Sequence, residues 1–252
     1  PVFFQADDGI RPFCLSRGLG DVYKRQEVFP GTWSESDTFY ATKDILGINT
    51  EYIWHKDQKL NNTDLIILPG GFSYGDYLRT GAIASFSPIV NKVKEFANSG
   101  GPVIGICNGF QILCETKLLP GILLRNKDLS FVCEWSNLKV NNNSIFTNKF
   151  KNDEIIKIPI SHGEGNFQAN ERTIKELEEE NRVIFRYCSD EGETNIISNP
   201  NGSINNIAGI INKQGNVLGM MPHPEKACEK IIGGIDGLGI FESVIKRVTN
   251  GN

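Results

Sequence analysis

Short runs of apolar residues alternate, along the first half of the chain, with a longer segment in which apolar residues recur every three or four positions. Residues 65–68 and 103–106 are continuous apolar runs, typical of strands buried on both faces of a sheet. Between them, residues 82–97 place their apolar side chains on one face of a helix, which Gly100-Gly101-Pro102 ends. A strand, a helix and a strand at this spacing predict a βαβ unit and therefore a parallel sheet. Two weaker elements continue the alternation, a helix at 37–46 and a strand at 50–54.

The second half has a different pattern, in which apolar runs are separated by turns rich in Asn, Gly and Asp. The predicted strands are 131–140, 155–160, 183–187, 207–211 and 217–221, and the predicted helices are 171–180 and 238–248. We find no internal repeat and no low-complexity linker. We therefore predict one α/β domain of the flavodoxin-like type, with a mostly parallel central sheet, helices on both faces and an antiparallel extension from the second half.

Composition narrows the range of partners and compartments. The 252 residues carry a net charge of −4, which favours neither nucleic acid nor an anionic membrane surface. No apolar run approaches the ~20 residues that a spanning helix needs, and we see no secretory signal. The six cysteines are scattered and form no C-x-x-C pair, which argues against structural zinc. We expect a cytoplasmic protein without nucleic-acid or membrane partners.

A candidate nucleophile follows the second predicted strand. Cys107 lies in a Gly-x-Cys-x-Gly turn, between Gly105 and Gly109, and a helical pattern resumes directly after it. A strand, a tight turn and a helix place a nucleophile at the tip of an α/β sheet. The turn strains its central residue, and flanking glycines let neighbours approach. Unpaired amides at the helix N-terminus would favour the thiolate. The alternative is a buried structural cysteine.

A cysteine nucleophile needs a base, and the chain has three histidines. His223 lies between two prolines directly after a predicted strand, and Glu225 follows two residues later. The Glu225 carboxylate could orient the imidazole and stabilise its protonated form. The alternative is a rigid surface turn. His55 follows Trp54 in a polar stretch, and we expect it at the surface.

Acyl transfer also needs hydrogen-bond donors for the developing oxyanion. The sequence Pro69-Gly70-Gly71-Phe72 ends the strand expected beside the Cys107 strand, so its backbone N–H groups and the amide of Asn108 are candidates. A strand exit with no chemical role is the alternative. The polar cluster at 161–166 is either a loop near a ligand or a plain turn. A phosphate-binding loop is not supported, because the segment at 70–75 lacks a Gly-Lys-Ser/Thr ending.

These motifs, in this order, resemble the class I glutamine amidotransferases. The longer strings at 68–79, 105–113 and 219–225 resemble the glutaminase subunits of phosphoribosylformylglycinamidine synthases, which act in purine biosynthesis. The string Phe-Ser-Tyr-Gly-Asp-Tyr-Leu-Arg at 72–79 is more specific than the cysteine motif. Shorter matches lie at 119–121, 125–128 and 162–167, and the resemblance runs from about residue 28 to the C-terminus.

The resemblance implies a division of labour between subunits. The glutaminase subunit hydrolyses glutamine through a cysteine thioester. The ammonia passes through a channel to a large synthase subunit, which uses ATP and Mg to convert formylglycinamide ribonucleotide to the amidine. The resemblance implies no cofactor or metal in this subunit, and its partners would be glutamine, the large synthase subunit, and a small accessory subunit.

The resemblance also implies roles for residues that match the family motifs. Cys107 would be the nucleophile, His223 the base and then the acid, and Glu225 the orienting carboxylate. Gly71 and Asn108 would form the oxyanion hole. Candidates for holding glutamine are Gln111, Asn126 and His162, and candidates for facing the partner or gating the site are Asp76, Tyr77 and Arg79.

Three other readings remain at this point. The chain could be the glutaminase of a GMP or CTP synthesis enzyme, although the loop at 74–79 speaks against this. It could be a cysteine hydrolase of the DJ-1/PfpI type, many of which place His directly after the nucleophile, where this chain has Asn108. It could be a non-catalytic binding subunit, which the intact Cys107, His223 and Glu225 disfavour.

The beginning of the chain departs from the resemblance. Family members open with an apolar first strand before Phe-Pro-Gly, whereas Phe29-Pro30-Gly31 here follows Lys24, Arg25, Gln26 and Glu27. Such side chains are not expected in the centre of a buried parallel sheet. We hypothesise that residues 1–26 are a poorly ordered artefact rather than the natural N-terminus, and we place the amidotransferase domain at 27–252. A genuine extension is the alternative.

Overall fold

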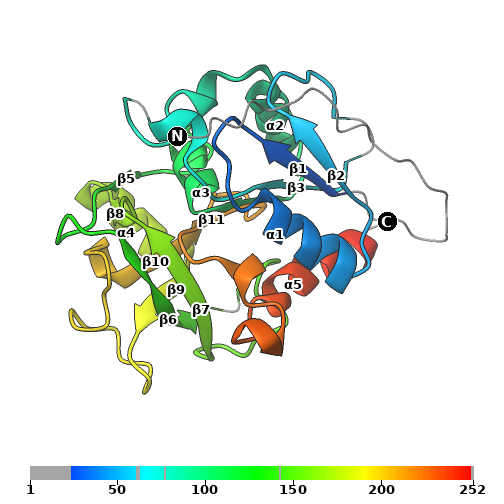
Figure 1. The fold of residues 1–252 in the computed structure, drawn as a ribbon. Helices are drawn as coiled ribbons and strands as arrows, with labels where there is room; N and C mark the ends of the chain where they lie inside the picture. The colour runs from blue at the N-terminus through cyan, green and yellow to red at the C-terminus, as the bar shows by residue number, and fades with distance from the viewer. Residues whose placement is uncertain (1–23, 61–62, 77, 142, 251–252) are drawn as a thin grey trace, which may run out of the picture.

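A mixed sheet runs through the computed structural model, which describes residues 24–60, 63–76, 78–141 and 143–250 (Figure 1). Its order is β2-β1-β3-β4-β11-β10-β9-β6-β7. The parallel half consists of β2 (Thr50–Trp54), β1 (Lys24–Val28), β3 (Leu65–Leu68), β4 (Val103–Ile106) and β11 (Val217–Met220). The antiparallel half consists of β10 (Ile207–Ile211), β9 (Val183–Cys188), β6 (Val132–Val140) and β7 (Ile155–His162). The predicted fold class, including the antiparallel extension, is confirmed.

Helices cover both sides of the parallel half (Figure 1). On one side lie α2 (Pro88–Asn98) and α3 (Asn108–Glu115), and on the other lie α1 (Glu35–Phe39) and α5 (Leu238–Asn250). A π-helical turn, Tyr40–Ile45, extends α1. Towards the antiparallel half lies α4 (Glu171–Glu179). Beside it is a second, two-stranded antiparallel sheet of β5 (Ile122–Leu124) and β8 (Asn166–Gln168), two strands that the sequence analysis did not predict. No helix in the described ranges is long and apolar enough to cross a membrane.

The centre of the sheet is the hydrophobic core. Every residue of β3 and β4 is buried, as expected for apolar strands with helices on both faces. The helix predicted at 82–97 begins later, because Pro88 is suited to the first turn of a helix and takes that place in α2. The residues before it form a separate 3₁₀ turn, Ala84–Phe86.

The expectation that residues 24–27 do not lie in the buried sheet is wrong. Strand β1 pairs in parallel with both β2 and β3, so residues 24–26 of the doubtful segment belong to the sheet. Gln26 and Glu27 are fully buried there. The Nε2 atom of Gln26 donates to the carbonyl oxygen of Glu35 at 2.7 Å. Backbone pairing and this bond offset part of the free-energy cost of burying the polar groups of β1. The rest of that segment, 1–23, lies outside the described residues, and its origin stays a hypothesis.

Candidate active site

Cys107 occupies a sharp bend between β4 and α3. Its backbone has φ 51° and ψ −105°, a strained conformation for a residue other than glycine, and it caps the N-terminus of α3. A Cβ on Gly109 would lie 2.0 Å from the carbonyl oxygen of Leu68. A Cβ on Gly105 would lie 2.4 Å from Leu113 and 2.7 Å from the backbone of Gly109. Both glycines are therefore needed for the close approach of β3, β4 and α3, as the motif predicted.

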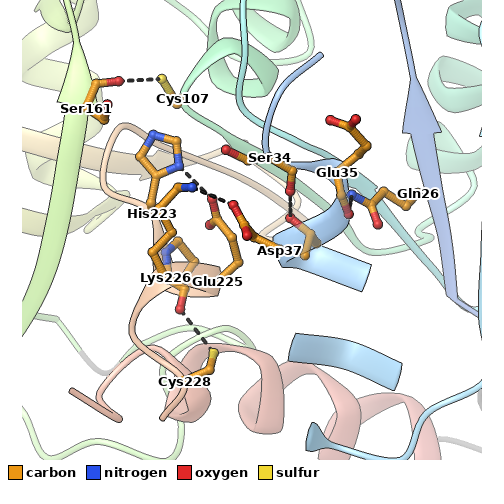
Figure 2. A network of polar contacts seen from close by, with 12 residues as sticks. Gln26, Ser34, Glu35, Asp37, Cys107, Ser161, His223, Glu225, Lys226 and Cys228 are labelled. Carbon is orange, nitrogen blue, oxygen red and sulfur yellow. Dashed lines mark hydrogen bonds and ion pairs between the residues drawn. The ribbon is translucent and has the colours of Figure 1, made fainter. Parts of the chain in front are cut away.

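His223 reaches the same place from the neighbouring strand. The backbone N–H of Cys107 donates to the carbonyl oxygen of Met220, the last residue of β11, at 2.8 Å. Gly70 shows how close the two side chains are: a Cβ at this position would lie 2.6 Å from Cε1 of His223 and 3.4 Å from Cβ of Cys107. Figure 2 shows the imidazole beside the cysteine, whose Sγ donates to the carbonyl oxygen of Ser161 at 3.7 Å.

Glu225 holds the His223 ring. Its Oε1 lies 2.6 Å from Nδ1 of His223, and both side chains are buried (Figure 2). Burial alone would lower the pKa of His223, but the Glu225 carboxylate, followed by Cys107, raises it to about 10. The ring is therefore stabilised as imidazolium. Its Nε2 has no hydrogen-bond partner among the residues the structure describes and can exchange a proton with a ligand.

A pocket of about 280 Å³ opens over these groups. Cys107 and His223 lie in its wall, together with residues from the loop after β3, from α3 and from the segment 161–164. Phe72, Trp33 and Phe131 also line it and are 47%, 75% and 54% exposed. These rim residues were missed by the sequence analysis, because isolated aromatic residues in loops carry no periodic signal.

The backbone N–H of Gly71 is available to a ligand. It forms an isolated antiparallel bridge with Thr32, in which the flanking residues make the hydrogen bonds: Trp33 N–H donates to Gly70, and Phe72 N–H donates to Gly31. The N–H of Gly71 has no acceptor among the described residues. Gly71 also lines the pocket. The amide of Asn108 begins α3, where helical N–H groups have no intrahelical partner. The structure thus brings both predicted donors beside Cys107.

The side chains of Asn108 and Gln111 form a chain of hydrogen bonds beside the pocket. Asn108 accepts from the backbone N–H of Ser73 at 3.2 Å and donates to Oε1 of Gln111 at 2.9 Å. Gln111 in turn donates to the carbonyl oxygen of Glu164 at 2.7 Å. Gln111 lines the pocket, but both ends of its amide already bind protein groups. The two amides together thus connect the backbone of Ser73 with that of Glu164.

His162 and Asn126 lie together but differ in their access to the pocket. His162 lines it, and its Nδ1 lies 3.2 Å from Oδ1 of Asn126. Burial, followed by the neighbouring His223, lowers the pKa of His162 to about 4, so this imidazole is neutral. Asn126 binds the backbone of Ser130, His162 and Gly165. It does not line the pocket, and we assign it to the scaffold rather than to glutamine contact.

The residues predicted to gate the site are dispersed. Asp76 lines the pocket. Arg79 lies on the outside and makes a two-pronged ion pair with Glu115, at 2.6 Å for each bond. Tyr77 lies outside the described residues.

His55 is buried, whereas the sequence analysis expected it at the surface. Tyr74 packs on its ring, and the Tyr74 hydroxyl lies 2.7 Å from Nδ1 of His55.

The described residues contain no group of three or more His, Cys, Asp and Glu side chains arranged to hold a metal ion. The five cysteines among them are all free thiols: Cys107, Cys114, Cys133, Cys188 and Cys228.

Comparison with known proteins agrees with this geometry. Residues 28–234 match the family of CobB/CobQ-like glutamine amidotransferase domains. The phosphoribosylformylglycinamidine synthase subunit PurQ of Moorella thermoacetica is 55% identical over 219 residues, which cover 86% of this chain and 93% of that protein. A structure of PurLQS from Thermotoga maritima contains a chain with a TM-score of 0.80 and 41% identity, and the match covers 90% of this chain and 99% of that chain.

Two more distant structures share the fold. A glutamine amidotransferase from Thermotoga maritima has a TM-score of 0.56 at 17% identity, covering 90% of this chain and 98% of its own. A putative GMP synthase subunit from Thermoplasma acidophilum has a TM-score of 0.54 at 14% identity, covering 91% of this chain and 95% of its own. At these identities the likeness concerns architecture alone. The matched domain and the 55% identity together show that the chain belongs to the PurQ family of glutamine amidotransferase enzymes.

Proposed function

We propose that this chain is the glutaminase subunit of a phosphoribosylformylglycinamidine synthase in purine biosynthesis. The observation that carries the proposal is the arrangement of Cys107, on its strained bend, beside a His223 ring that Glu225 holds as imidazolium. The pocket above them is of a size suited to one amino acid.

The chemistry follows from this arrangement. The Cys107 thiolate attacks the side-chain amide carbon of glutamine, and the N–H groups of Gly71 and Asn108 donate to the resulting oxyanion. The protonated ring of His223 then gives its proton to the departing ammonia, which leaves a γ-glutamyl thioester. Water, giving a proton back to His223, attacks the thioester and releases glutamate. One water is consumed and one ammonia is formed in each cycle.

The ammonia goes, in this proposal, to the large synthase subunit, where ATP and Mg belong. A small accessory subunit and a cytoplasmic location complete the proposal. They rest on the resemblance and on the free cysteines, which persist in a reducing compartment. The family assignment does not favour the DJ-1/PfpI alternative.

Cys107→Ala tests the proposal in the assembled complex. We expect loss of glutamine-dependent amidine synthesis, and no glutamyl adduct anywhere on the variant chain in acid-quenched samples analysed by mass spectrometry, whereas the wild-type chain carries one. Synthesis supported by added ammonia should persist, because the synthase subunit is unchanged. Cys133→Ala, at an exposed thiol that does not line the pocket, is the matched control and should retain both activities. Full glutamine-dependent activity in Cys107→Ala would refute the assignment.

A further inference from the structure

Two carboxyl groups line the same pocket as Cys107, and the chemistry above uses neither of them. They belong to Asp76 and Glu164. Oδ1 of Asp76 is buried and has no hydrogen-bond partner in the described parts of the chain. Burial, and secondarily the negative charge of Glu164, raise the pKa of Asp76 to about 6. Asp76 is half-buried, and its Oδ1 lies in the buried part without a partner, which is unfavourable for a carboxylate. Glu164 differs, because its Oε1 lies 3.7 Å from Nε of Arg125.

A strained loop holds Asp76 in this position. Tyr74, Gly75 and Asp76 have φ values of 56°, 68° and 55°, and two of these three residues carry a Cβ that disfavours this region. The hydroxyl of Tyr74 fixes the loop, because it lies 2.7 Å from Nδ1 of His55 and 3.0 Å from the hydroxyl of Ser87. Strain that is held in place by the surrounding structure is typical of functional sites.

A hydrogen bond from α3, the helix that follows Cys107, holds Glu164 in position. Its carbonyl oxygen accepts from Gln111, and its carboxylate accepts from Thr80. Gln111 lies one helical turn beyond Cys107, which corresponds to about 6 Å along the helix axis. This distance is comparable with the length of an extended glutamine side chain. A glutamine whose amide carbon meets the thiol can extend along the pocket towards Asp76 and Glu164, which line it.

We propose that Asp76, together with Glu164, binds the α-ammonium group of glutamine and makes the pocket selective for the free amino acid. The inference rests on the proposed glutaminase function. An ammonium beside two carboxylates forms charge-assisted hydrogen bonds. An amide without this ammonium, such as glutamine within a peptide, leaves Oδ1 of Asp76 without a partner. Sites built around a polar substrate group reject analogues that lack it.

Substrate pairs test the proposal in the complex with the synthase subunit. Glutarate monoamide has the same reacting amide as glutamine but no α-amino group. We expect Asp76→Asn to raise KM for glutamine about 30-fold or more, with a much smaller change in kcat, and to leave kcat/KM for glutarate monoamide unchanged. Asp44→Asn, at an exposed carboxylate that does not line the pocket, is the control and should change neither. Equal losses on both substrates, or none on glutamine, would overturn the inference.

A second measurement covers an Asp76→Asn chain that fails to assemble. Cys107 of the chain alone is alkylated with 6-diazo-5-oxo-L-norleucine, which carries the α-ammonium, and with iodoacetamide, which does not. Only the first reaction should slow in the variant, and equal slowing of both would contradict the inference. Absence of any glutamyl thioester in the wild-type complex would instead refute the proposed function itself, and this inference with it.

Discussion

Glu27 provides a quantitative test of the energetics of the sheet. It lies on β1 between two parallel neighbours, it is fully buried, and neither carboxylate oxygen has a hydrogen-bond partner among the described residues. Burial raises its pKa from 4.5 to about 8. The folded chain therefore keeps a proton on Glu27 at neutral pH that the unfolded chain releases.

The sign and size of the effect follow from this difference. Below about pH 4.5 both states hold the proton and Glu27 has no pH-dependent effect. As the pH rises towards 8, the unfolded chain is favoured by about 1.4 kcal/mol per pH unit. The total reaches about 5 kcal/mol above pH 8, which is a large fraction of the stability of an ordinary domain. Glu27→Gln keeps the size of the side chain and removes the titration.

Urea unfolding at several values between about pH 5 and pH 8 measures the effect. The free energy of unfolding of Glu27→Gln should exceed that of the wild type by an amount that grows by about 1.4 kcal/mol per pH unit. Glu179→Gln, at an exposed position on α4, is the control and should show a difference that does not grow with pH. A difference between Glu27→Gln and wild type that stays constant with pH would refute the reasoning, because it would mean that the carboxylate is solvated or paired.

Two further predictions concern the His223 ring. Gly70→Ala places a methyl group 2.6 Å from the His223 ring. We expect the rate of glutamine hydrolysis in the complex to fall about 100-fold, because the ring is displaced. Activity within threefold of wild type would show that the ring can move aside. Glu225→Gln removes the main group that raises the pKa of His223. The ring should then titrate at lower pH by NMR, and the glutaminase rate should fall on the order of 10⁴-fold; an unchanged titration would show that Glu225 does not set the charge of the ring.

The cysteine bend could be predicted because sequence and local geometry are tightly linked there. A buried strand, two glycines and a resumed helical pattern around Cys107 are compatible with few backbone paths, and the structure has the expected one. The strands of the second half were also recognisable, since β10 lies at 207–211 as predicted and β7 extends the predicted run by two residues.

Strand β1 could not be predicted from composition. Charged residues argue against a buried strand, yet backbone pairing with β2 and β3 places Glu27 in the core. Tertiary context overrides side-chain preference here, at the energetic cost estimated above.

The partners of the polar side chains around the pocket could not be predicted from the sequence either. Gln111 and Asn126 are amides in motif positions, and a sequence does not tell whether an amide meets a substrate or another loop. The structure shows protein partners for both side chains. Conversely, the sequence named Asp76 only as a candidate for facing the partner or gating the site, because the burial of its Oδ1 depends on a left-handed loop that the sequence pattern does not show.

Cys107 and His223 each follow one of two adjacent strands, β4 and β11, and this placement affects how such a protein can change over time. Hydrogen-bonded strands lie about 4.8 Å apart, and the bond from Cys107 to Met220 belongs to this pairing. The bend at Cys107 is thus held by the central ladder, and the backbone N–H of His223 donates to the carbonyl oxygen of Pro159 in β7 at 2.8 Å, so the sheet positions both groups. Rim loops can therefore diversify to suit new assemblies while the bond-breaking machinery stays in register.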